Sequence, residues 1–123
     1  MSLHPDLAAR LDERFGTRFD APVELKLDAL LLRLDNGVIL EARIAAPDAY
    51  AIAWVWGDAE LRIDTAPVHP ELATFPHHVH GADGRLRADP LTVCGADPFD
   101  NLVRVVDALL EDPLLGAPPG TAP

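Results

Sequence analysis

Four of the five histidines lie within one short stretch, residues 69–80, which we call the histidine segment. An imidazole titrates near neutral pH, so a group of them can transfer protons in catalysis or, when neutral, bind a transition metal. If residues 77–80 are extended, His78 and His80 point to one side of the chain and His77 points to the other. The histidine segment is therefore the first candidate for a functional site.

An acid–base interpretation places two of these imidazoles on either side of a bound phosphodiester, one as general base and one as general acid. Arg85 or Arg87 would then stabilise the negative charge that develops in the transition state. This chemistry is a metal-independent, ribonuclease-like activity that needs no cofactor.

Two other interpretations use the same residues. His78 and His80 on one strand are two ligands for a divalent transition metal, with His69 or Glu71 as the third. Alternatively, the histidines bind loop carbonyls and hold a proline-rich segment against the rest of the protein. Because the spacing matches no established zinc signature, the residues leave all three interpretations open.

The first elements that must position these residues are a helix and a hairpin. Residues 5–15 are expected to be helical, because Leu7, Leu11 and Phe15 recur every four residues and Gly16 can end the helix in the left-handed conformation. Farther along, Asn36-Gly37 between two apolar runs predicts a two-residue hairpin turn. That register gives one apolar face, made of Leu25, Leu27, Ala29 and Leu31 with Val38, Leu40, Ala42 and Ile44.

A second hairpin is predicted at Gly57-Asp58, with Trp54 and Trp56 in the core. A carboxy-terminal helix that begins at Pro98, with Asp97 as its N-cap, is expected to cover the apolar face of the sheet. The other face of the second hairpin would carry ordinary solvent-exposed charges, namely Glu60, Arg62 and Asp64.

Residues 66–95 contain four proline turns and a short predicted strand at 85–88, so this loop-rich segment is the expected location of function. Residues 113–123 are rich in Pro and Gly without apolar periodicity, which predicts a disordered tail. We therefore predict a single α+β domain at residues 1–112. It would have an antiparallel twisted sheet of about four or five strands, an amino-terminal helix and a covering carboxy-terminal helix.

The composition limits the function further. The chain has 123 residues and a formal net charge of -10, and such a field disfavours tight nonspecific binding of nucleic acid. No apolar run approaches the roughly 20 residues of a membrane span, and the start of the chain has no signal-peptide pattern. We therefore expect a cytoplasmic protein without membrane association. The single Cys94 is expected to be a small buried hydrophobe.

The run Thr74-Phe75-Pro76-His77-His78-Val79-His80 resembles the signature of the TumE-like family of small bacterial and archaeal toxin–antitoxin proteins. Members typically carry an Arg-x-Asp-Asn-x-Pro-His-His run followed by Thr-Phe-Pro-His-His-Lys-His, and the similarity extends from about residue 25 to residue 111. The resemblance implies a toxin, encoded beside a DNA-binding antitoxin that neutralises it in a complex. The candidate site that it implies consists of Asp64, His69, His77, His78 and His80.

Two residues depart from the family pattern. Val68 replaces the first His of the usual pair, and Val79 replaces the usual basic residue. Both changes remove polar function, so together with the acidic charge they favour a member that binds a partner without toxicity.

Taken together, the sequence predicts a toxin-like component of a toxin–antitoxin system that acts on nucleic acid through the histidine cluster. The alternatives are a non-toxic interaction or regulatory module of the same family, or a metal-binding protein. The target and the oligomeric state are left open.

Overall fold

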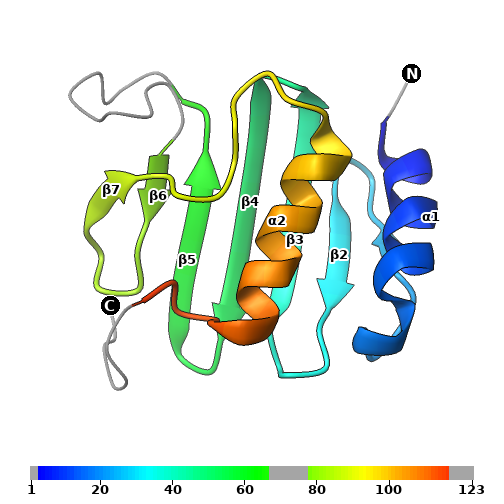
Figure 1. Cartoon of the computed structure of the whole chain (residues 1–123), viewed down its shortest axis with the longest axis horizontal. Coiled ribbons are helices and arrows are strands. Elements are labelled where there is room, and N and C mark those ends of the chain that lie inside the picture. The colour runs from blue at the N-terminus through cyan, green and yellow to red at the C-terminus, as the bar shows by residue number, and fades with distance from the viewer. Residues whose placement is uncertain (1–2, 67–77, 117–123) are drawn as a thin grey trace.

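The computed structural model describes residues 3–66 and 78–116. Within these two ranges, helices α1 (His4–Phe15) and α2 (Pro98–Glu111) cover one face of an antiparallel sheet (Figure 1). A short 3-10 turn, Gly16–Arg18, follows α1. The strands are β1 (Glu24–Leu25), β2 (Leu30–Arg33), β3 (Ile39–Ala46), β4 (Ala49–Trp56), β5 (Ala59–Asp64), β6 (His78–His80) and β7 (Leu86–Ala88).

The strands lie side by side in chain order, and every neighbouring pair is antiparallel. The predicted α+β class with its two helices is confirmed, but the predicted strand number is wrong, because the described part of the chain forms seven strands. One expected strand is divided into β1 and β2 by a turn, in which the Lys26 N–H donates to the Ala29 carbonyl at 2.8 Å. The histidine segment contributes a further strand, β6.

The turn between β2 and β3 has one more residue than predicted. The Leu34 N–H donates to the Val38 carbonyl at 2.9 Å, so the loop consists of residues 35–37, and Gly37 has a left-handed φ of 94°. Changing the loop length by one residue shifts the pairing and exchanges the two faces of the first strand.

This shift decides which leucines of the first hairpin are buried. Leu30 and Leu32 lie in the core, whereas Leu31 pairs with Glu41 on the opposite face. Leu25 and Leu27 are exposed, so the predicted apolar face is wrong at Leu25, Leu27 and Leu31. On the second strand of the hairpin the prediction is confirmed, with burial of Val38, Leu40, Ala42 and Ile44.

The hairpin between β4 and β5 has the predicted form. Trp56 pairs with Ala59, which leaves the two-residue loop Gly57-Asp58. The predicted core position is confirmed for Trp54, which is buried, and wrong for Trp56, which is 39% exposed at the end of the strand. The Trp56 indole N–H donates to the Asn36 carbonyl at 3.0 Å.

Helix α2 spans the predicted residues, and the Asp97 carboxylate caps it by accepting from the Phe99 N–H at 2.8 Å. Its buried residues include Leu102, Val106 and Leu109, which pack into the core. Helix α1 lies beside it, with the Arg10 guanidinium 4.0 Å from the centre of the Phe99 ring. Gly16 has a right-handed φ of -53°, so the predicted left-handed helix stop is wrong and the chain continues into the 3-10 turn.

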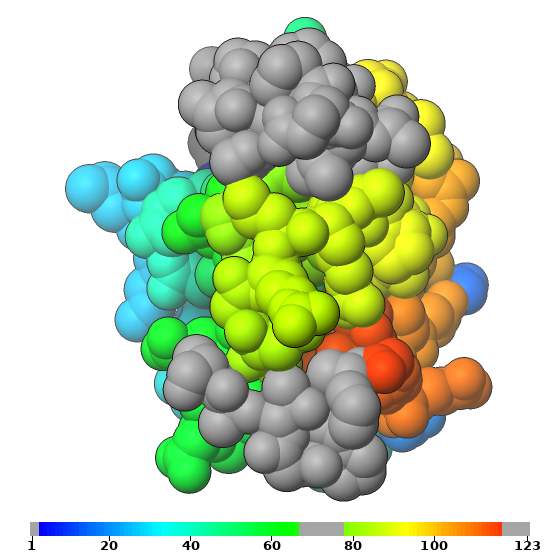
Figure 2. Space-filling model, turned by 90° about the vertical axis from the view of Figure 1, so that its left-hand side faces the viewer, coloured from blue at the N-terminus to red at the C-terminus, as the bar shows by residue number. Residues whose placement is uncertain are grey.

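The residues that follow α2 contact the sheet. The Pro113 carbonyl accepts from the Trp54 indole at 2.9 Å, Leu114 is buried, and the Leu115 carbonyl accepts from Arg87 at 2.6 Å. Figure 2 shows this turn, coloured red, beside the β6–β7 hairpin. The rest of the predicted tail, residues 117–123, lies outside the described residues. None of the helices in the described ranges is long and apolar enough to cross a membrane.

Candidate functional site

The face of the sheet opposite the helices, which we call the open face, carries alternate residues of each strand. Arg62 and Asp64 of β5 point to this face, and so do His78 and His80 of β6. Antiparallel pairing places Asp64 opposite His78 and Arg62 opposite His80. Because directly opposite Cβ atoms lie about 5 Å apart, these four side chains meet at one end of the sheet.

These four residues form a connected group, which we call the Asp64 cluster. Asp64 Oδ1 lies 2.9 Å from His78 Nε2, and Asp64 Oδ2 lies 3.4 Å from His80 Nε2. Arg62 donates through Nε to Asp64 Oδ2 at 2.8 Å and through Nη2 to His80 Nε2 at 3.0 Å. The Ala66 N–H also donates to Asp64 Oδ1, at 3.1 Å. Asp64 is therefore the central acceptor, and Arg62 joins it to His80.

The members of the cluster differ in exposure. The side chain of His78 is 2% exposed and that of Asp64 is 13% exposed, compared with 32% for His80 and 51% for Arg62. A ligand that approaches from solvent therefore reaches Arg62 and His80 first, with Asp64 and His78 behind them.

His80 is neutral at pH 7. Burial and then the Arg62 cation lower the pKa of His80 below its usual 6.5, and these effects outweigh the opposite effect of Asp64. In the tautomer with its proton on Nδ1, the neutral ring accepts from Arg62 through Nε2. The lone pair of Nε2 therefore lies beside a fixed cation.

A groove of about 570 Å³ lies on the open face beside the cluster. Its floor includes Ala53 and Val55 of β4, whose short side chains lie between longer ones on β3 and β5. Arg62 and His80 line this groove, which has the size of a small-ligand site. The two exposed members of the cluster thus face a cavity that can hold a substrate.

A family model described as Toxin TumE matches residues 7–113, which include the whole Asp64 cluster. The chain belongs to the TumE toxin family. Membership supports a toxin-like role in a toxin–antitoxin system and, in general terms, an antitoxin as partner. No curated protein and no solved structure matches the chain significantly.

In this TumE family member, the residues predicted for the site fall into three groups. The structure brings Asp64, His78 and His80 together. His69 and His77 lie outside the described residues. Arg85 and Arg87 bind groups outside the Asp64 cluster. The positive charge beside the histidines therefore comes from a different residue.

Arg85 follows the turn between β6 and β7, where its side chain is 87% exposed and lies 4.0 Å from the Asp83 carboxylate. Arg87 pairs with Val79, on the helix side of the sheet, and its guanidinium binds the Leu115 carbonyl. The cation beside the histidines is Arg62 instead, for which the strand alternation predicts an ordinary solvent-exposed charge. The Arg-x-Asp spacing of the TumE signature was the signal that could have found it, because residues two apart on a strand share a face.

The family departure at Val79 has a different consequence from the one predicted. Val79 is fully buried in the core and pairs with Ile63, so its side chain lies on the opposite face from His78 and His80. A valine at this position therefore removes no cation from the Asp64 cluster, and the predicted loss of a phosphate-binding charge there is wrong. Val68, the other departure, lies outside the described residues.

Three members of the cluster can also bind a metal ion. Asp64, His78 and His80 each offer one ligand atom, and these atoms lie within 4.8 Å of one another. Imidazole and carboxylate donors suit Zn²⁺ and other divalent transition metals. Arg62 opposes such binding, because its guanidinium donates to both Asp64 and His80 and a metal would have to displace it.

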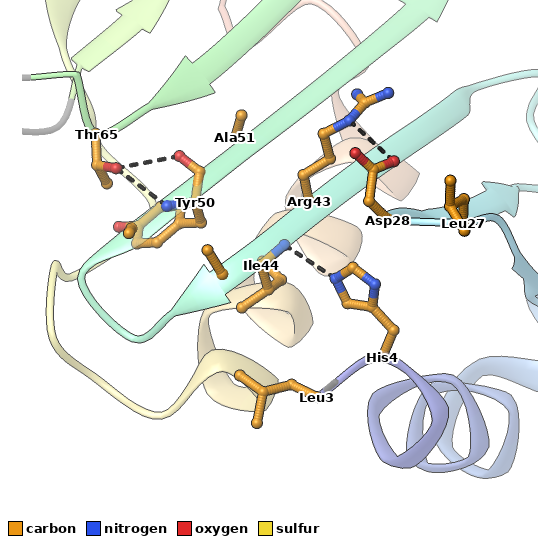
Figure 3. A pocket seen from close by; sticks show the side chains of 11 residues that line it. Leu3, His4, Leu27, Asp28, Arg43, Ile44, Tyr50, Ala51 and Thr65 are labelled. Atoms are coloured by element: carbon orange, nitrogen blue, oxygen red, sulfur yellow. Dashed lines mark hydrogen bonds and ion pairs between the residues drawn. The ribbon is translucent and has the colours of Figure 1, made fainter. Parts of the chain in front are cut away.

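A second hollow, of about 610 Å³, lies near the turn between β3 and β4 (Figure 3). There His4 Nε2 accepts from the Ile44 N–H at 3.1 Å, and Arg43 lies 3.7 Å from Asp28. The Thr65 hydroxyl accepts from the backbone N–H of Tyr50 at 3.0 Å. These polar side chains bind the backbone or one another, so we do not place the functional site in this hollow.

A buried polar group also lies on the helix side of the sheet. The Tyr50 hydroxyl is 2.7 Å from Thr92 Oγ1, and the Thr92 hydroxyl also binds the Asp89 carboxylate. Burial raises the pKa of Tyr50 to about 12, so its phenol stays protonated. Cys94 is half-buried, so the prediction of a buried hydrophobe is wrong. The burial that it has raises the pKa of its thiol, which argues against Cys94 as a nucleophile.

Proposed function

We propose that this TumE family toxin cleaves a phosphodiester bond in RNA, with His80 as general base and Arg62 as the group that stabilises developing charge. The observation that carries the proposal is the 3.0 Å contact between the Arg62 guanidinium and Nε2 of neutral His80, at the side of the open-face groove. A phosphodiester bound there meets a proton acceptor and a fixed cation at one point.

In the proposed reaction, Arg62 Nη2 moves from His80 Nε2 to the bound phosphate. The freed Nε2 takes the proton of a ribose 2′-hydroxyl, and that oxygen attacks phosphorus. The bond from phosphorus to the 5′-oxygen of the next nucleotide breaks, which leaves a 2′,3′-cyclic phosphate. The leaving oxygen takes a proton from a second acid, for which the sequence offers His69 and His77. Asp64 holds Arg62 at 2.8 Å and His78 holds Asp64 at 2.9 Å, so Asp64 and His78 are positioning residues.

The acidic charge of the chain determines how RNA would bind. A net charge of -10 repels RNA at long range, so affinity must come from contacts inside the groove rather than from a basic surface. We therefore expect a single-stranded substrate, whose unpaired nucleotide can enter the groove.

The test is cleavage of a mixed-sequence single-stranded RNA by the purified protein in EDTA, with detection of 2′,3′-cyclic phosphate ends. Arg62→Gln should lower the rate about 10²- to 10³-fold. Arg85→Gln removes the same charge from a residue that does not line the groove, so it should leave the rate unchanged. Equal losses in the two variants, with both folded by circular dichroism, would refute the role of Arg62.

His80 as the base also predicts the pH dependence. The rate should fall as pH drops through the pKa of His80, which lies below 6.5, and should be flat at neutral pH. Arg62→Gln removes a cation that lowers this pKa and leaves Asp64, which raises it. The residual activity should therefore begin to fall at a higher pH than that of the wild type, and identical profiles would contradict the proposal.

Toxicity provides a test in cells. Expression of the wild type should arrest bacterial growth, and simultaneous substitution of His78 and His80 by Ala should restore it. If a folded double variant stays toxic, the histidine mechanism is wrong. A wild type that leaves growth untouched but binds an antitoxin would instead support a non-toxic interaction module.

A second candidate, binding of a divalent transition metal, is favoured by the convergence of Asp64, His78 and His80 within 4.8 Å. Under this candidate, loss of the Arg62 charge should strengthen binding at the site instead of weakening its function. Because the guanidinium competes with a metal for Asp64 and His80, Arg62→Gln should bind Zn²⁺ or Ni²⁺ more tightly than the wild type. Calorimetric titration with each metal alone, on protein without a His-tag, measures this, and no binding to either protein eliminates the candidate.

A further inference from the structure

We propose that the open-face groove selects guanine, with the Glu60 carboxylate as the group that recognises the base. This inference rests on the proposed function, because it takes the phosphate of the same nucleotide to lie at Arg62 and His80. It adds the substrate class, which is single-stranded RNA cleaved on the 3′ side of guanosine.

The register of the central strands gives the groove its shape. Because neighbouring strands are about 4.8 Å apart, residues on β5 and β3 that flank one residue of β4 are about 10 Å apart. Only alanine or valine lies between them, which leaves a trough with an apolar floor where a planar base can lie. Two neighbouring rows of paired residues, each running across β5, β4 and β3, form the trough. The first row is Arg62, Ala53 and Glu41, and the second is Glu60, Val55 and Ile39.

The groove has a cationic part and an anionic part. Arg62 and Glu60 are two residues apart on β5, so about 7 Å separates their Cα atoms. A phosphate is attracted to Arg62 and repelled by Glu60, which orients a nucleotide with its phosphate at Arg62 and its base toward Glu60. This separation is comparable with that between the phosphate and the base of one nucleotide.

Glu60 is the carboxylate of the groove that is available to a ligand. It makes no hydrogen bond or ion pair with any other residue that the structure describes, whereas the Glu41 carboxylate pairs with Arg43. Both Glu60 and Glu41 line the groove. A base that approaches the anionic part therefore meets at Glu60 an acceptor that none of the described residues occupies.

The chemistry of a carboxylate selects the base. An ionised carboxylate only accepts hydrogen bonds, and its two oxygens can accept two parallel ones. Guanine presents two adjacent donors, N1–H and the N2 amino group. Adenine and cytosine present a single amino group, and uracil presents a single N3–H. Guanine is therefore the base that satisfies both oxygens of Glu60.

The test is calorimetric binding of the four 3′-nucleoside monophosphates to the whole protein. We expect 3′-GMP to bind about ten- to one hundredfold more tightly than 3′-AMP, 3′-CMP or 3′-UMP. Inosine 3′-monophosphate, which lacks the N2 amino group, should bind with intermediate affinity.

Two matched variants separate base recognition from overall charge. Glu60→Gln replaces one acceptor oxygen by a donor, so it should lower the affinity for 3′-GMP to that for 3′-AMP. Glu24→Gln makes the same charge change outside the groove, at a residue that pairs with Arg33 at 3.4 Å, and should keep the guanine preference.

The outcomes distinguish the two proposals. If the nucleotides bind without base preference, or if Glu60→Gln keeps the preference, guanine selection is overturned and the proposed function stands. If no nucleotide binds and no RNA is cleaved, the proposed function fails and the inference fails with it.

Discussion

Asn36 connects the β2–β3 turn to the end of α2, and its replacement should measure how strongly the two are joined. Its Nδ2 donates to the Leu109 carbonyl at 2.8 Å and to the Leu110 carbonyl at 3.4 Å. Its Oδ1 accepts from the Val38 N–H at 3.2 Å. The two carbonyls belong to the last turn of the helix, where no later helical N–H can satisfy them.

Asn36→Ala removes all three contacts. A typical hydrogen bond contributes about 1 kcal/mol net to stability, so two good bonds and one weak one predict a loss of about 2 kcal/mol in the free energy of unfolding. For a domain of this size, that loss corresponds to a Tm about 6–10 °C lower.

Asn36→Asp makes the prediction more specific. It keeps the size of the side chain, loses the donors and places a negative charge at the carboxyl end of α2, where the helix dipole is also negative. At neutral pH it should therefore destabilise the protein at least as much as Asn36→Ala. The excess should disappear in acid, where the new carboxylate is protonated.

Urea denaturation followed by tryptophan fluorescence measures these changes. Asp58→Ala, in the exposed turn of the other hairpin, is the control and should change stability by less than about 0.5 kcal/mol. If Asn36→Ala and Asp58→Ala give the same stability with unchanged m-values, the turn does not hold the helix and the reasoning is refuted.

Three further predictions follow from particular residues. Gly37 has a φ of 94° and Gly16 a φ of -53°, so in urea Gly37→Ala should lose about 1 kcal/mol or more while Gly16→Ala should be neutral or stabilising. Tyr50 is the single tyrosine of the chain, so spectrophotometric titration should show phenolate formation at a pKa of about 12, and a midpoint at the usual 10.0 would contradict its burial. Val79→Lys introduces the basic residue of the family pattern into the core, so it should lower the unfolding free energy by more than about 2 kcal/mol without faster RNA cleavage. A gain in cleavage would contradict the core position of Val79.

Capping and turn residues in the sequence correctly predicted the elements that depend on contacts within a few residues. Asp97 before Pro98 predicted the start of α2, and Gly57-Asp58 predicted a hairpin that the pairing of Trp56 with Ala59 confirms. Such signals act within a few residues, where capping and turn chemistry are determined.

The first hairpin shows where local signals fail. The same Asn36-Gly37 pair fits a two-residue or a three-residue loop, and the two loops expose opposite faces of β2. The side chain of Asn36 bonds to the carbonyl of Leu109, more than 70 residues away. The packing of α2 against the sheet therefore favours the longer loop, and a sequence pattern does not contain that contact.

Strand alternation in the sequence was sufficient to put His78 and His80 on one side of the chain, and the residue types were sufficient to name acid–base or metal chemistry. Only the tertiary structure decided that Arg62, 18 residues before His80, is the cation beside it rather than Arg85 or Arg87. The reason is that alternation is a property of one strand, whereas the neighbour across a strand pair depends on the register in which the whole sheet buries its apolar face.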